Sequence, residues 1–312
     1  MAQEKIDPVN GIVLVHKSEG MSSHDVVHKL RRIFNIKKIG HFGTLDPFAR
    51  GLLVIGIGEG VKLSQFLIND DKEYTGAVKF GENTDTYDCT GKITEKFQIK
   101  ELKREQILEA LKSMTGTVMQ TPPKYSAIKL NGKPLYKYSR EGKEVTPAPR
   151  KVTISKIDIL DFNGVDTLEI KIVCSKGTYI RSIAYDLGNI LGVGGHLSSL
   201  LRTRSGSFEL KDALSLDNLI NQKNVYDIIK PLKDVLDSYS TYYADKQHEE
   251  MLRQGKKIIL SDLTKINNGT ASYIRIVGKN NLIAIGDVEE AITGERSLKT
   301  FYFNNIRVFN DY

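Results

Sequence analysis

The chain has 312 residues, 40% of them hydrophobic, which is enough for one large domain and a small one with a buried core. Its net charge of +7 suggests a polyanionic partner, and the first 240 residues carry most of it, because residues 241–312 hold 10 Lys and Arg against 9 Asp and Glu. No apolar run approaches the roughly 18 residues of a membrane span, and the N-terminal residues lack the pattern of a secretory signal, so we expect a cytoplasmic protein with no membrane partner.

The first part of the chain mixes predicted strands and helices. Apolar runs at 11–15 and 51–58 predict buried strands, and residues 73–81 alternate in polarity, with Tyr74 on the same side as Val78. A helix is predicted between the first two strands, with Ser22 or Ser23 as its N-cap. Its apolar stripe comprises Val26, Val27, Leu30, Ile33 and Phe34.

The middle of the chain continues this mixture. A helix is predicted over 104–115, a basic and tyrosine-rich loop over 122–143, and strands near 152–160 and 167–174. A Ser-Lys-Gly turn then leads into a helix that is expected to end at Gly188. Because no regular βαβ repeat is present, the fold class is predicted to be α+β rather than a doubly wound sheet.

The pattern changes near residue 241, where short strands separated by turns begin. We therefore expect a first domain over 1–240 and a small β-rich domain over 241–312. Cys89 and Cys174 lie far apart and match no metal or redox spacing, so two buried free thiols are expected. His24 and His28 share a helix face, but no further ligand residue lies nearby, so no metal site is predicted.

One short stretch stands out for its single acid. In GHFGTLDPFARG, residues 40–51, Asp46 is the only carboxylate between Asp25 and Glu59. Flanking glycines permit unusual backbone angles, and Pro47 restricts the chain directly after the acid. From the loop alone, Asp46 either caps a turn or performs chemistry on a negatively charged substrate.

Longer segments carry a resemblance to a known family. The stretch GHFGTLDPFARGLLVIGIGEGVK resembles the catalytic motif of the bacterial tRNA pseudouridine synthase B (TruB) family. Four further segments resemble family motifs in the same order, so that the likeness covers roughly residues 10–210; they are EGMSSHDVVHKLRRIF, DKEYTGAVKFGENTDTYDCTGKI, PPKYSAIKLNGKPLYKYSREGKEV and CSKGTYIRSIAYDLGNILGVGGHLSSLLRTRSGSF. The C-terminal part resembles the small PUA RNA-binding domain. One departure is Ser18, where the family usually has proline after the lysine.

The resemblance implies a fold and a reaction. The fold would be that of pseudouridine synthases, with a central mixed, largely antiparallel sheet flanked by helices. The reaction would be the isomerisation of uridine to pseudouridine at position 55 in the T loop of tRNA, by a stand-alone enzyme without cofactor, metal or guide RNA. We expect a monomer, because the RNA face would occupy much of the surface.

The same resemblance implies the site residues. Asp46 would be the nucleophile or base, Arg181 its guanidinium partner, and Tyr74 a stacking platform whose hydroxyl could move the C5 proton. Tyr179 and Leu200 would line the base pocket, and His41 would contact flipped nucleotides. Phosphate contacts are expected from basic residues of two segments, namely Lys129, Lys133, Lys137, Arg140, Arg202 and Arg204.

Two other functions remain open from the sequence. The protein could act mainly as a tRNA-binding folding helper, with catalysis secondary, although intact Asp46, Tyr74 and Arg181 argue against a pure binder. It could also modify another RNA, such as ribosomal RNA, or work in a guided complex. The lysine- and tyrosine-rich segment 122–143 favours the stand-alone bacterial form.

Overall fold

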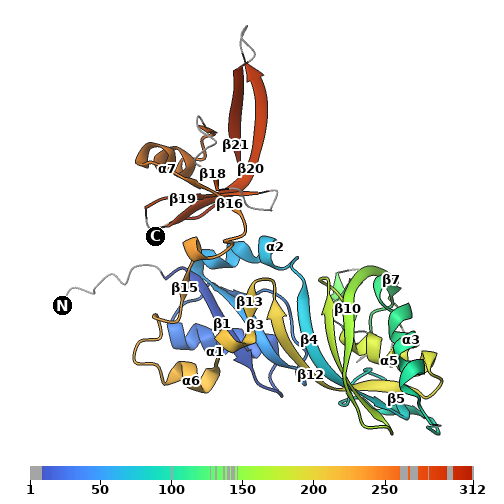
Figure 1. The fold of residues 1–312 in the computed structure, drawn as a ribbon. Coiled ribbons are helices and arrows are strands. Elements are labelled where there is room, and N and C mark those ends of the chain that lie inside the picture. Colours follow the sequence, from blue (N-terminus) through green and yellow to red (C-terminus); the bar gives the residue numbers. More distant parts are fainter. Residues whose placement is uncertain are drawn as a thin grey trace.

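The computed structural model describes residues 9–310, except 100, 127, 131, 136–137, 139–140, 142–144, 146, 261–265, 268–272, 280 and 294–297. A large sheet forms from the first part of the chain and a smaller sheet from the last part. The smaller unit sits at one end of the larger one, and a long hairpin projects from it (Figure 1). No helix in the described ranges is long and apolar enough to cross a membrane.

The large sheet has 11 strands. They are β1 (Gly11–Lys17), β2 (Ile39–His41), β3 (Arg50–Ile57), β4 (Lys72–Phe80), β7 (Gly116–Gln120), β10 (Arg150–Phe162), β11 (Thr167–Cys174), β12 (Gly195–Ser205), β13 (Phe208–Glu209), β14 (Leu214–Ser215) and β15 (Lys230–Pro231). The order along the main path is β14-β1-β3-β12-β4-β11-β10-β7, with β2, β13 and β15 paired to β3, β12 and β1. Only β1–β14 and β3–β12 are parallel among these pairings, which confirms the predicted mixed, largely antiparallel α+β sheet.

Helices flank this sheet, and two small hairpins lie outside it. The helices are α1 (Ser23–Phe34), η1 (Gly58–Leu63), α2 (Ser64–Leu67), α3 (Arg104–Ser113), α5 (Ile180–Ile190), η2 (Leu210–Asp212), α6 (Leu216–Ile220) and η3 (Leu232–Asp234), and the hairpins are β5 (Glu82–Thr84) with β6 (Ile93–Lys96) and β8 (Lys129–Leu130) with β9 (Lys133–Pro134). Helix α1 begins as the sequence predicts, because Ser22 and Asp25 form a reciprocal capping box. It ends at Asn35, whose φ of 52° is left-handed.

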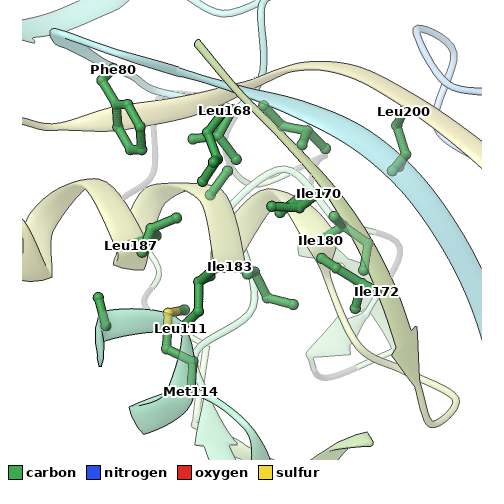
Figure 2. Packing of buried hydrophobic residues seen from close by; sticks show 14 of the residues in the cluster. Phe80, Leu111, Met114, Leu168, Ile170, Ile172, Ile180, Ile183, Leu187 and Leu200 are labelled. Carbon is green, nitrogen blue, oxygen red and sulfur yellow. The ribbon is translucent and has the colours of Figure 1, made fainter. Parts of the chain in front are cut away.

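Helix α5 packs on the sheet through its apolar face. Ile180, Ile183 and Leu187 contact the strand residues Leu168 and Ile170 and their neighbours in one buried cluster (Figure 2). The helix runs to Ile190, so the prediction that it ends at Gly188 was wrong. A Cβ at Gly188 would lie 2.2 Å from the carbonyl carbon of Gly194. Gly188 therefore permits close packing inside the helix rather than ending it.

The smaller sheet has six strands in the order β17-β21-β20-β19-β16-β18. Its elements are β16 (Ser240–Tyr243), α7 (Lys246–Arg253), β17 (Ile258–Leu260), β18 (Ile266–Asn267), β19 (Ile274–Val277), β20 (Leu282–Thr293) and β21 (Leu298–Val308). Val277, Leu282, Ile285 and Phe309 join one buried cluster with residues of the large unit, including Phe42. The two units therefore share a core, and part of it lies beside the loop that holds Asp46.

Candidate active site

The Asp46 loop connects β2 to β3 and is bent by glycine. Gly51 has a φ of 108°, and a Cβ there would lie 2.4 Å from the carbonyl oxygen of Arg202 on the neighbouring strand β12. Only glycine permits both that backbone angle and that contact. The Asp46 carbonyl accepts the Ala49 amide at 3.1 Å, which closes a turn directly after the acid. The bracket of glycines in the sequence thus lets β3 lie against β12 while the loop turns.

Residues from the end of β1 to the first residue of α1 hold the loop on both sides of the acid. The Ser23 hydroxyl accepts the Leu45 amide at 2.8 Å and donates to the Leu45 carbonyl at 3.1 Å. The Pro47 carbonyl accepts the Gly20 amide at 2.8 Å and the Lys17 ammonium at 3.3 Å. The first motif of the sequence therefore fixes the main chain on either side of Asp46.

Lys17 is fully buried, and its ammonium serves this anchoring. It also donates to the carbonyls of Ser18 at 3.0 Å and Met21 at 2.7 Å. Burial lowers the pKa of Lys17 to about 8. Ser18, which replaces the family's proline, provides its backbone carbonyl to this contact, so the departure removes no polar group from the site.

Arg202 approaches the loop from the opposite side. Its side chain is 1% exposed and donates to the carbonyls of Leu52 at 2.7 Å and Gly43 at 3.1 Å. The phosphate contact expected of Arg202 stays a prediction, because the guanidinium binds main-chain oxygens inside the protein and the residue also lines the cavity in front of Asp46. A basic residue in a strand can point inward as readily as outward, and the sequence alone does not show which.

Arg181 is the second residue of α5, and its guanidinium reaches the carboxylate of Asp46. Its Nε lies 2.9 Å from Oδ2, and one terminal nitrogen donates to Oδ1 at 3.1 Å. Other donors bind the carbonyls of Thr86 at 3.0 Å and Tyr125 at 3.1 Å. Gln120 fixes the start of the helix, since its amide side chain bonds both the N–H and the carbonyl of Tyr179. Arg181 and Asp46, which are 135 positions apart in the sequence, are thereby in contact, as the resemblance predicts.

Asp88 is the residue that sequence reasoning missed. Its carboxylate is buried and lies 3.3 Å from a terminal nitrogen of Arg181, so one guanidinium contacts two acids. The other Asp88 oxygen accepts the Thr90 amide at 3.0 Å and the hydroxyls of Thr90 and Thr86. The only sequence signal was its place in a segment that resembles a family motif. The next residue, Cys89, is exposed, which corrects the expectation of two buried thiols; Cys174 is buried and both are free.

Burial and the Arg181 guanidinium have opposite effects on the pKa of Asp46. Burial raises the pKa of Asp46 above its ordinary value, and the nearby Asp88 carboxylate adds to that rise, while the Arg181 guanidinium opposes it. The Asp46 side chain is 34% exposed, against 5% for Arg181. The acid is therefore the more open of the two side chains, and the guanidinium beside it is largely buried.

A cavity of about 260 Å³ lies in front of Asp46. Tyr74, Leu200 and Tyr179 line it together with Asp46 and Arg181. They meet because β4 pairs with β12, so that Tyr74 faces Arg202 and Gly76 faces Leu200. Burial raises the pKa of both tyrosines, which keeps their hydroxyls protonated near neutral pH.

Of the other predicted contact residues, His41, Arg204 and Lys133 do not line this cavity. The Nδ1 of His41 is buried without a hydrogen-bond partner among the described residues. Arg204 donates to the Gly206 carbonyl at 3.0 Å, and Lys133 pairs with Glu141. Lys137 and Arg140, and the side chain of Lys129, lie outside the described part of the chain.

The arrangement suits acid–base or nucleophilic chemistry on a planar group. One carboxylate faces a cavity with aromatic and aliphatic walls, and a guanidinium favours its ionised form. No group of three or more His, Cys, Asp or Glu side chains in the described ranges could hold a metal ion, and Arg181 contacts the carboxylates of both Asp46 and Asp88.

Family models match most of this chain. Residues 31–180 match the TruB family pseudouridylate synthase N-terminal domain, and residues 181–239 match the tRNA pseudouridylate synthase B C-terminal domain. The tRNA pseudouridine synthase B of Francisella philomiragia is 43% identical over 260 residues, which cover 77% of this chain and 85% of the relative. That of Clostridium tetani is 37% identical over 281 residues, covering 89% and 95%.

Solved structures share the fold. A Cbf5-Nop10-Gar1 complex matches with a TM-score of 0.72 at 23% identity, covering 96% of this chain and 85% of the matched chain. An H/ACA ribonucleoprotein bound to a substrate RNA that contains 2′-deoxyuridine matches with a TM-score of 0.71 at 20% identity, with the same coverage. These structures support the pseudouridine synthase fold.

Proposed function

The chain belongs to the TruB family of pseudouridylate synthases, and on that premise we propose that its cavity converts uridine to pseudouridine at position 55 in the T loop of tRNA. The protein is an RNA-modifying isomerase. The observation that carries the assignment to this cavity is the contact of Arg181 with Asp46, from distant parts of the chain, at the wall of a pocket lined by two tyrosines.

The reaction needs no external group. The N1–C1′ bond of the nucleotide breaks and a C5–C1′ bond forms, while C5 loses a proton and N1 gains one. Asp46 acts on the sugar or the base as nucleophile or general base. Its main chain is fixed on both sides of the acid, so the carboxylate is held in place before the substrate arrives.

Arg181 opposes the protonation of this carboxylate that burial favours. Burial alone favours the protonated acid, which is a poor nucleophile and base. The planar fork of the guanidinium fits the carboxylate with two contacts, and its remaining donors are held by main-chain oxygens and by Asp88. Asp88 is thus proposed to orient Arg181 rather than to touch the substrate.

The cavity walls receive the extruded base. A uridine must leave its stack, at a cost of about a few kcal/mol, before an enzyme reaches its glycosidic bond. Tyr74 lines the cavity and provides an aromatic face that recovers part of this cost, and its hydroxyl is proposed to take or give the C5 proton. Tyr179 and Leu200 complete the walls, and His41, on the strand that leads to the loop, contacts neighbouring nucleotides.

The wider interface with tRNA is proposed from the basic segments of the large unit and from the smaller C-terminal unit. The phosphate backbone meets the basic segments that include Lys129, Lys133 and Arg204, whereas Arg202 holds the Asp46 loop from inside. Residues 241–312 form a PUA-like domain that adds RNA contacts. The enzyme acts on its own, as a monomer without guide RNA, in the cytoplasm.

Asp46→Asn tests the central role. The amide has nearly the same shape as the acid but is neither a nucleophile nor a base at this position, so release of tritium from 5-tritiated uridine in tRNA should fall below detection. Binding of the tRNA and the melting temperature should stay near those of the wild type. If the variant releases tritium at a rate near that of the wild type, Asp46 is not the catalytic acid.

A further inference from the structure

The loop between β5 and β6 provides two of the groups that hold Arg181. The Thr86 carbonyl accepts one guanidinium nitrogen at 3.0 Å, and the same nitrogen lies 3.3 Å from the Asp88 carboxylate. The residue between them, Tyr87, has a φ of 62°. A left-handed backbone is unfavourable for a residue with a bulky side chain, so other contacts must stabilise it.

An aromatic stack provides such a contact. The rings of Tyr87 and Tyr185 lie 3.9 Å apart between centroids, with an angle of 16° between their planes. Tyr185 lies on α5, four residues after Arg181, so the two side chains project from the same side of the helix. The stack therefore joins the strained point of the loop to the helix that carries the guanidinium.

Main-chain bonds hold the loop on its other side. The Tyr87 carbonyl accepts the Leu197 amide at 3.0 Å, and the Leu197 carbonyl accepts the Cys89 amide at 3.0 Å. The Tyr87 amide also donates to the Thr84 carbonyl at 3.2 Å, so these bonds hold the main chain of the loop while the stack holds the Tyr87 side chain. Neither tyrosine lines the cavity in front of Asp46.

We propose that the Tyr87–Tyr185 stack is a positioning element that holds the Thr86 carbonyl and the Asp88 carboxylate against Arg181. The proposal rests on the proposed function, because the guanidinium matters only if Asp46 performs the chemistry. Loss of the stack lets residue 87 leave its left-handed conformation. The two partners of Arg181 then move with it, and the guanidinium no longer meets Asp46 in one geometry.

The first experiment compares Tyr185→Ala with Tyr185→Phe. Phenylalanine preserves the stack and should keep kcat on tRNA within about twofold of the wild type. Alanine should lower kcat roughly 10- to 100-fold, as expected for a misplaced catalytic group, with little change in KM. A phenylalanine variant as impaired as the alanine variant, or a rise in KM with kcat unchanged, would overturn the proposal in favour of a direct RNA contact.

The pH profile separates positioning from general stability. Asp46 faces Arg181, Asp88 and Lys17, and the hydroxyls of Tyr74 and Tyr179, so a displaced Arg181 removes its main counter-charge. In Tyr185→Ala the acidic limb of the profile of kcat against pH should therefore move to higher pH, because the pKa of Asp46 rises. An unchanged limb would mean that the stack acts only on stability. Asp186 lies beside the pair, and Asp186→Asn in both backgrounds removes its own titration from the comparison.

A glycine rescue tests the role of the strained backbone. Glycine adopts a positive φ without strain, so Tyr87→Gly added to Tyr185→Ala should regain part of the lost kcat, whereas Tyr87→Ala should not. Equal activity of the two double variants would contradict the proposal. An inactive wild-type protein would instead refute the proposed function, so the two failures are distinguishable.

Discussion

Asp46 is held from two sides, and the two sides use their cations differently. On one side, Arg181 contacts the carboxylates of Asp46 and Asp88. On the other side, Lys17 and Arg202 donate to main-chain carbonyls of the loop. Arg181 acts mainly on the charge of the catalytic acid, whereas Arg202 acts on the position of its loop; Lys17 fixes the loop and also lowers the pKa of Asp46. Buried cations of similar appearance thus have separable effects on pH dependence and on stability.

Arg181→Lys should have the largest effect. A lysine cannot contact both oxygens of Asp46 while also reaching Thr86 and Asp88, so kcat should fall by roughly 10²-fold or more. Because the guanidinium opposes the effect of burial, its loss raises the pKa of Asp46, and the acidic limb of the kcat profile should move to higher pH. An unshifted limb with low kcat would contradict the division between the two sides.

Arg202→Lys is the matched variant on the other side. It keeps a positive charge but cannot span the carbonyls of Leu52 and Gly43, so the free energy of unfolding should fall by about 2 kcal/mol. The acidic limb of kcat should stay where it is, because Arg202 makes no contact with the Asp46 carboxylate. Chemical denaturation and a pH–rate profile measure the two quantities. A shift of the limb as large as that of Arg181→Lys would remove the distinction.

A smaller effect is expected from Lys17 at alkaline pH. Its pKa is about 8 in the folded protein and 10.5 ordinarily, so between these values the unfolded chain holds a proton that the folded protein has lost. The contribution of Lys17 to stability therefore rises with pH from 8 to 10.5 and is constant below that window. The free energy of unfolding of the wild type, minus that of Lys17→Met, should therefore increase as the pH rises from 8 to 10.5. A constant difference would show that Lys17 is not perturbed by burial.

The sequence indicated those parts of the site whose signals are local. Glycines around Asp46 marked a constrained acid, and the pair Ser22 and Ser23 marked the start of α1, where Ser22 is the N-cap. The partnership of Asp46 with Arg181 came from the family resemblance, because no spacing in the sequence connects them. The α+β class followed from the mixture of strand and helix patterns.

The features that were missed depend on tertiary contacts. Asp85 and Asp88 lie in the same polar loop, and no local pattern shows that Asp88 is the one that turns inward to Arg181. Arg202 looked like a surface cation because strands show both of their faces in sequence, yet the fold buries it. Gly188 resembled a helix end, but it is a packing position. In each case a distant segment decides the role of the residue.

The most direct test is a nucleotide-resolution map of pseudouridine in tRNA from a strain that lacks this protein. Uridine 55 should be unmodified there, modified again when the wild-type protein is restored, and still unmodified when Asp46→Asn is expressed at the same level. Growth of the same strains distinguishes catalysis from a tRNA-folding role, because the Asp46 variant would restore growth if folding of tRNA were the main role. A fully modified position 55 in the deletion strain, or restoration by Asp46→Asn, would contradict the account.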